Sequence, residues 1–198
     1  MATVAVDKSR RRFLIASTSV VGGAGALAVA WPFLSSMQPS ARARAAGAPV
    51  EVDVGKIAPG EMIRVEWRGQ PVWIVHRTDE MLSSLSALSS KLRDPDSAVE
   101  TQQPAYAKNE VRSIKPEYLV LVGICTHLGC SPTFRPEPAP ADLGAEWKGG
   151  FFCPCHGSRF DLAGRVYQNV PAATNLIVPP YTYLTETRIL VGEDQGAA

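Results

Sequence analysis

The stretches C-T-H-L-G-C (residues 125–130) and C-P-C-H-G-S (residues 153–158) decide how this chain of 198 residues folds. Together they hold all four cysteines and two of the three histidines, and 22 residues separate them. Cysteine and histidine are typical metal ligands, and six of the chain's seven fall in one window of 32 residues. The clustering therefore predicts a metal site built from two loops.

This window offers more donors than one site needs. A tetrahedral zinc ion or a [2Fe-2S] cluster takes four protein ligands, so two of the six donors must have another role. Surplus thiols outside the cytoplasm usually pair with each other. A zinc ribbon is the main alternative, although zinc ribbons favour C-x-x-C pairs and neither motif fits that spacing well.

Short β-favouring runs surround both motifs and predict a small, mostly β, antiparallel fold. The expected strands cover residues 50–54, 62–67, 72–76, 119–124, 151–152, 176–178, 181–185 and 188–191. The sequence Arg68-Gly69-Gln70-Pro71 is a turn signal and predicts a hairpin. Two of the strands lead directly into the two motifs, which predicts that the motifs occupy facing loops.

Two connecting segments have their own patterns. Met81, Leu85, Leu88 and Leu92 recur at helical spacing and predict one amphipathic helix. Residues 131–149 contain four prolines, which exclude a regular central strand and predict an ordered surface excursion.

The N-terminal region predicts an exported, membrane-anchored protein. Residues 9–14 read S-R-R-R-F-L, close to a twin-arginine export signal. Residues 13–34 carry no charge and would form about 33 Å of helix, enough to span a bilayer. Cleavage at A-x-A, residues 41–43 or 43–45, is the alternative, but the apolar run is longer than that of most signal peptides.

The expected organisation follows from these segments. Residues 1–12 lie in the cytoplasm, because basic residues there oppose export. Residues 13–34 form the transmembrane anchor, residues 35–49 form a flexible tether, and residues 50–198 form the domain, with its metal-binding part at about 120–180. We expect this domain in the periplasm and the anchor in the bacterial inner membrane. A net charge of +1 without a basic stripe excludes nucleic acid as a partner.

The two motifs resemble those of the Rieske family, C-x-H-x-x-C and C-x-x-H, with an extra cysteine inside the second. The resemblance implies one [2Fe-2S] cluster in a small antiparallel β domain with a cluster-binding subdomain. It assigns the ligands as Cys125 and Cys153 on one iron and His127 and His156 on the other. It also implies that Cys130 and Cys155 form a disulfide.

The surroundings of the cluster can be compared with the same family. Ser158 matches a serine whose hydroxyl donates to a cluster sulfur. Phe160 stands where many quinol-oxidising members have tyrosine, and we expect a lower potential as a result. Residues 171–176, P-A-A-T-N-L, resemble the proline loop beside the cluster, with Ala173 in place of its second proline.

As a whole, the chain resembles the family of iron-sulfur subunits of bacterial ubiquinol-cytochrome c reductase. This implies an enzyme subunit that oxidises ubiquinol, passes the electron to a c-type cytochrome and contributes to proton translocation. It implies a quinol hydrogen bond to His156, a second exposed ligand in His127 and a docking tip at Leu128. The implied partners are the cytochrome b and c-type cytochrome subunits, ubiquinol and membrane lipid, in a dimeric complex.

Three other functions are compatible with parts of the pattern. The small Rieske subunit of an exported oxidase, such as arsenite oxidase, also carries a twin-arginine signal, but the anchor and the proline loop disfavour it. A soluble Rieske ferredoxin serving an oxygenase lacks both the extra cysteine pair and an export signal. A non-redox binding module stabilised by a metal would be colourless when purified.

Overall fold

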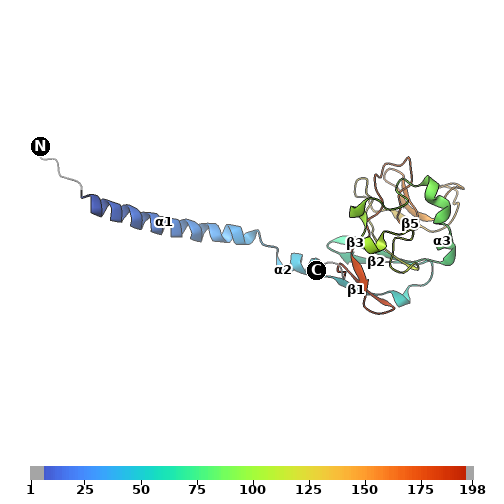
Figure 1. The fold of residues 1–198 in the computed structure, drawn as a ribbon, viewed down its shortest axis with the longest axis horizontal. Coiled ribbons are helices and arrows are strands. Elements are labelled where there is room, and N and C mark those ends of the chain that lie inside the picture. The colour runs from blue at the N-terminus through green and yellow to red at the C-terminus, as the bar shows by residue number, and fades with distance from the viewer. Residues whose placement is uncertain (1–6, 195–198) are drawn as a thin grey trace. The chain divides into compact units, whose positions relative to one another are not determined.

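The computed structural model describes residues 7–194. The chain forms two compact units, and the boundary between them in the sequence falls between residues 45 and 46. The first unit contains α1, Lys8–Ser36, drawn in blue in Figure 1. Asp7 caps this helix, because its carboxylate accepts hydrogen bonds from the amides of Ser9 and Arg10. The helix is long and apolar enough to cross a membrane.

A second, short helix follows within the segment expected to be a tether. It is α2, Ala41–Ala46, with the sequence A-R-A-R-A-A. Alanine and arginine are both good helix formers, so this composition favours a helical turn. Residues 37–40 and 47–49 on either side of α2 are not helical.

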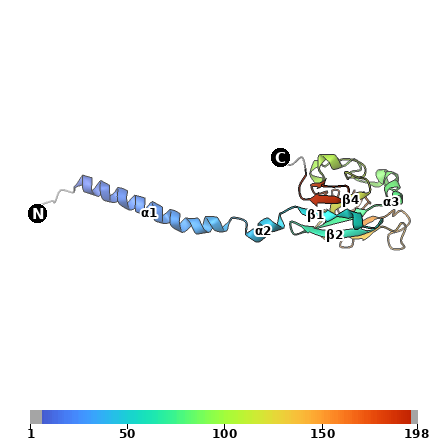
Figure 2. The same cartoon turned by 90° about the horizontal axis from the view of Figure 1, so that it is seen from below.

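The second unit is mostly antiparallel β structure, as predicted, and consists of three sheets of three strands each (Figure 1, Figure 2). The sheet orders are β1-β9-β8, β2-β3-β4 and β5-β6-β7. The strands are β1 Val50–Asp53, β2 Met62–Trp67, β3 Gln70–His76, β4 Tyr118–Val122, β5 Thr133–Arg135, β6 Gly150–Cys153, β7 Ser158–Phe160, β8 Tyr181–Tyr183 and β9 Arg188–Val191.

The predicted hairpin between β2 and β3 is confirmed. Its two connecting residues, Arg68 and Gly69, both have positive φ, at 53° and 70°. Positive φ at both positions is the geometry of the turn that best matches the twist of a two-residue hairpin. The resulting register pairs Met62 with Val75 and Trp67 with Gln70.

The prediction of a single amphipathic helix over residues 81–92 is wrong. The structure has α3, Asp79–Ser83, and then a separate 3-10 segment, η2, Ser86–Lys91. The hydroxyls of Ser83 and Ser84 donate to the carbonyls of Glu80 and Met81, at 2.9 and 2.7 Å, within this stretch. Such local bonds compete with a continuous helix. The leucines at positions 85, 88 and 92 are nevertheless buried.

Two further short segments complete the connection from β3 to β4. They are η3, Glu100–Gln102, and η4, Ala105–Ala107, and both are 3-10 turns. A further 3-10 turn, η1, Val54–Lys56, directly follows β1.

Residues 176–178 do not form the expected strand. The amide of Leu176 donates to Gly164 O, and that of Val178 donates to Gln102 O, both at 2.8 Å. The segment thus bonds to two loops, and the prolines that follow at 179 and 180 have no amide hydrogen to continue a ladder. The proline-rich excursion, by contrast, contributes only the edge strand β5, in agreement with the prediction.

The core joins the sheet β2-β3-β4 to the sheet β5-β6-β7. Trp73 of β3 stacks on Phe151 of β6, with ring centroids 5.2 Å apart and planes inclined by 15°. The same indole packs against Gly123, where an added Cβ would lie only 2.2 Å from Trp73 Cε2. Gly123 therefore lets the chain pass the indole on its way from β4 to Cys125.

Candidate metal centre

The two motifs occupy loops that each close on themselves through backbone hydrogen bonds. In the first loop, which follows β4, the amide of Cys125 donates to Cys130 O at 2.7 Å. The second loop is the hairpin connection between β6 and β7, where Cys153 is the pairing partner of Ser158. Gly129 and Gly157 have φ of 83° and 77°, a conformation that glycine adopts without strain.

A disulfide between Cys130 and Cys155 joins the two loops across a sequence separation of 25. The bond uses two of the six candidate donors. The sulfur atoms of Cys130, Cys153 and Cys155 lie within 4.8 Å of one another, so the disulfide is adjacent to the Cys153 thiol. Both loops are thereby held next to the same group of sulfur atoms.

The other two cysteines, Cys125 and Cys153, are free thiols and are each only 2% exposed. Burial raises the pKa of the Cys125 thiol, and contact with Cys153 adds to this rise. Hydrogen bonds from the backbone of His127 and from the Ser158 side chain act in the opposite direction. Buried, adjacent thiols of this kind are suited to a metal, because a cation replaces their protons.

The two histidines face each other from the two loops. The ring centroids of His127 and His156 are 4.7 Å apart, and the ring planes are nearly perpendicular at 89°. His156 is exposed and His127 is half-buried, whereas the two free thiols are buried. Leu128, which follows His127 in the first loop, is 71% exposed.

The proline loop, residues 171–176, is bonded to both metal-binding loops. The amide of Ala172 donates to Ser158 Oγ at 3.0 Å, and Thr126 Oγ1 donates to Thr174 O at 2.7 Å. Ser158 uses its oxygen as the acceptor, so its own proton is available for the neighbouring Cys125 sulfur. Sequence reasoning missed Thr126, because it stands at an unspecified position of the first motif.

Two other residues considered from the sequence have clear structural positions. Phe160 is fully buried at the end of β7 and presents no hydroxyl to the thiols. His76, the third histidine, lies outside the site, with Nδ1 2.6 Å from Ile57 O and its ring against Tyr118.

The donor set that remains after the disulfide is two thiols and two imidazoles on facing loops. A Rieske [2Fe-2S] cluster replaces two of the usual four thiolates by histidines on one iron. The buried thiols and the more exposed histidines therefore fit such a cluster.

Comparison with known proteins identifies the family. Residues 49–182 match the model of the Rieske [2Fe-2S] domain, and residues 1–40 match that described as "Ubiquitinol-cytochrome C reductase Fe-S subunit TAT signal". The ubiquinol-cytochrome c reductase iron-sulfur subunit of Allochromatium vinosum is 64% identical over all of this chain and 95% of its own length. The chain belongs to the family of Rieske iron-sulfur subunits of ubiquinol-cytochrome c reductase.

Other relatives extend the comparison. The iron-sulfur subunit from Blastochloris viridis is 44% identical, with 94% of each chain covered. A solved chain titled "Hyperthermophilic respiratory Complex III" is 26% identical, with a TM-score of 0.49, and covers 90% of this chain and 98% of its own. As a member of this family, the chain is an electron-transfer subunit of ubiquinol-cytochrome c reductase and carries a Rieske [2Fe-2S] cluster.

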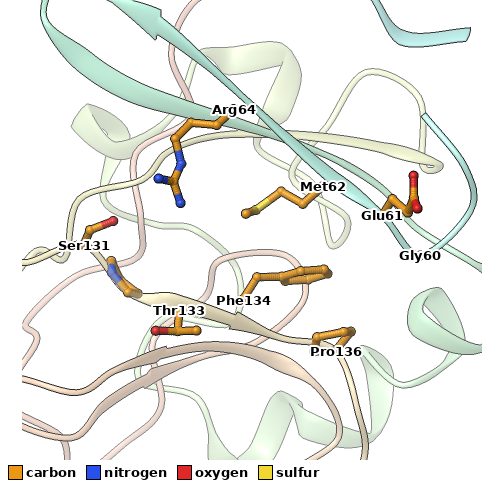
Figure 3. Close-up of a pocket in the computed structure, with 9 residues that line it drawn as sticks. Gly60, Glu61, Met62, Arg64, Ser131, Thr133, Phe134 and Pro136 are labelled. Atoms are coloured by element: carbon orange, nitrogen blue, oxygen red, sulfur yellow. The ribbon is translucent and has the colours of Figure 1, made fainter. Parts of the chain in front are cut away.

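A groove of about 740 Å³ lies elsewhere on the Rieske domain (Figure 3). Arg64 and Met62 of β2 form one wall, and Thr133 and Phe134 of β5 form the other. Its lining includes Ser131, the neighbour of Cys130, but none of the four free donors. The groove is therefore separate from the metal centre.

Proposed function

We propose that Cys125 and Cys153 bind one iron of the cluster and that His127 and His156 bind the other. The Cys130–Cys155 disulfide carries this assignment, since it leaves four free donors in the two loops. When bound, the cluster supplies a one-electron acceptor of comparatively high potential, within roughly −150 to +300 mV for this class.

We further infer that His156 receives ubiquinol. It is the exposed member of the histidine pair, and no charged residue stands beside it in the loop Cys153–Ser158. Its imidazole would accept a hydrogen bond from the quinol hydroxyl and take up a proton as an electron is accepted. Electron uptake and proton uptake are linked because a ligand histidine holds its second proton more tightly when the neighbouring iron is ferrous.

The buried residues around this histidine serve to keep the electron acceptor in a dry, fixed site. Cys125 and Cys153 are buried, and the disulfide and the proline loop hold the two loops together. Leu128, 71% exposed beside His127, forms an apolar docking tip. Complex III membership implies cytochrome b and c-type cytochrome partners, and we propose that the same tip serves both in turn.

The membrane topology completes the proposal. We infer that α1 anchors the subunit in a bacterial inner membrane, with its N-terminus in the cytoplasm and the Rieske domain in the periplasm. Lys8 and Arg10–Arg12 precede the apolar part of α1, which is the arrangement expected of a cytoplasmic end. We also propose that the segment 35–49 allows the domain to move between docking partners and that the parent complex is a dimer.

Ligand substitution tests the assignment. Cys153→Ser and His156→Gln should each abolish bound iron and acid-labile sulfide in the full chain purified from membranes. His76→Gln is the matched control, because it removes the histidine that lies outside the site and should leave the iron content unchanged. Full iron content in Cys153→Ser or in His156→Gln would overturn the proposal. Loss of iron from His76→Gln, with iron retained in the two ligand variants, would also overturn it.

A further inference from the structure

Three arginine side chains are buried inside the Rieske domain. Arg77, Arg112 and Arg165 are 2%, 0% and 1% exposed. Within residues 7–194, Asp161 is the one buried carboxylate, and it pairs with Arg165 at 2.8 Å. Arg77 and Arg112 therefore have no buried counterion of their own.

Neutral acceptors hold the guanidinium group of Arg77, which lies just after β3. Its Nη1 donates to Val111 O at 2.8 Å and to Leu162 O at 3.0 Å. Its Nη2 donates to Ser113 Oγ at 2.8 Å, and its Nε donates to Pro116 O at 2.9 Å. These bonds satisfy the N–H groups but do not cancel the charge.

Neutral acceptors also hold the terminal nitrogens of Arg112, whereas its buried Nε has no hydrogen-bond partner. Its Nη1 donates to Ala163 O at 3.1 Å. Its Nη2 donates to Leu176 O at 2.8 Å and to Gln103 Oε1 at 3.0 Å. Each acceptor is again neutral, so this charge is also retained in the interior.

Both groups remain cations near neutral pH. Burial lowers the pKa of Arg77 and of Arg112 to about 10, and attraction by Asp161 opposes this decrease. Asp94 and Glu117 also attract these groups, but both are only partly buried, so water screens them more effectively.

The acceptors connect these charges to two segments, the chain just after β7 and the proline loop. Leu162 and Ala163 follow Ser158 by four and five residues, so their Cα atoms lie within about 18 Å of its Cα at the extended-chain limit. Leu176 is the last residue of the proline loop. Both buried cations are thus hydrogen-bonded to the chain within a few residues of β7 or to the end of the proline loop.

We propose that Arg77 and Arg112 raise the reduction potential of the cluster through their buried charge, in addition to bonding the loops. Electron uptake adds negative charge at the metal centre, and a nearby cation in a low-dielectric interior favours that state. The inference rests on the proposed function only in requiring that the cluster be bound. We expect the contribution of the two arginines to the reduction potential to be insensitive to salt, because their side chains are shielded from solvent ions.

A charge-retaining substitution separates this role from a purely structural one. Arg112→Lys keeps the cation but loses most of the hydrogen bonds, whereas Arg112→Gln loses the cation. EPR-monitored redox titration of the full chain in membranes should give a lowered midpoint potential for Arg112→Gln and a value near wild type for Arg112→Lys. The lowering should be the same at low and high ionic strength. The pair Arg77→Lys and Arg77→Gln provides the same comparison if the Arg112 variants do not accumulate.

Arg93 supplies the matched control. It is exposed, yet its Nη2 also donates to a backbone carbonyl, that of Val170, at 3.2 Å. Arg93→Gln should leave the midpoint unchanged at physiological salt. An unchanged midpoint in both Gln variants of the buried arginines, or equal lowering in the Lys and Gln variants, would overturn the proposal. Lack of any Rieske signal in the wild type would instead contradict the proposed function.

Discussion

The amide of Ala172 donates a hydrogen bond of 3.0 Å to the hydroxyl of Ser158. The bond connects the proline loop to the start of β7, where the second metal-binding loop ends. Ser158 is fully buried and also contacts the Cys125 thiol, so one side chain links three segments of the site.

Ser158→Ala should lower the midpoint potential of the cluster, because a hydroxyl that donates to a sulfur favours the reduced state. It should also destabilise the domain by about 1–3 kcal/mol, the usual cost of leaving a buried amide, here that of Ala172, without its acceptor. Redox titration and urea unfolding measure the two effects. Ser131→Ala, at an exposed serine beside Cys130, is the control, and equal effects in both variants would contradict the assignment.

Phe160→Tyr should raise the midpoint potential. Phe160 is buried at the end of β7, and a tyrosine there would add a hydroxyl donor near the thiolates. Phe160→Leu keeps the site apolar and serves as the comparison in the same redox titration. A midpoint that stays unchanged or falls in Phe160→Tyr would show that this hydroxyl does not reach the cluster.

Thr126→Val should loosen the proline loop while leaving the side-chain shape nearly unchanged. The variant removes the 2.7 Å bond from Thr126 Oγ1 to Thr174 O and should cost about 0.5–1.5 kcal/mol. Faster amide hydrogen exchange at residues 172–176 is the expected result. Thr101→Val, at an exposed position outside the site, should leave that exchange unchanged. Wild-type exchange in Thr126→Val would exclude this bond as a restraint.

Removal of the disulfide should affect the cluster more than the fold. Chain-entropy reasoning assigns a disulfide closing a loop of this length a stabilisation of roughly 3.5 kcal/mol, but neither Cys130 nor Cys155 lies within a strand of the three sheets. In the double variant Cys130→Ser, Cys155→Ser, we expect reduced cluster occupancy and a changed midpoint with β-sheet circular dichroism retained. Full occupancy at the wild-type midpoint would refute this expectation.

Alkaline pH should destabilise the domain through Tyr181. This side chain is fully buried, its hydroxyl accepts from the Ile114 amide at 2.9 Å, and burial raises its pKa to about 12. An unfolded tyrosine ionises near pH 10, so its contribution is complete below about pH 10 and is lost as pH rises toward 12. Urea unfolding at several pH values should show a shallower decrease for Tyr181→Phe. An identical slope would assign the alkaline loss to other groups.

Local chemistry made much of this structure predictable. The clustering of cysteine and histidine indicated the site, and Arg68-Gly69 between two β-favouring runs indicated the hairpin. The Thr126–Thr174 bond was not predictable, because it joins residues 48 positions apart and threonine at that position carries no signal of its own. The burial of Arg77 and Arg112 was also not predictable from the sequence, since arginine is normally exposed and only the folded chain brings carbonyls around it.

The most direct test of the central claim is an EPR spectrum of membranes containing the full chain, reduced with ascorbate and then titrated for its midpoint potential. We predict a Rieske-type EPR signal that appears after reduction with ascorbate, because two histidine ligands raise the potential of the cluster into the range of a quinol oxidant. A signal that develops only with dithionite, or a membrane-bound chain with zinc in place of iron, would contradict the account.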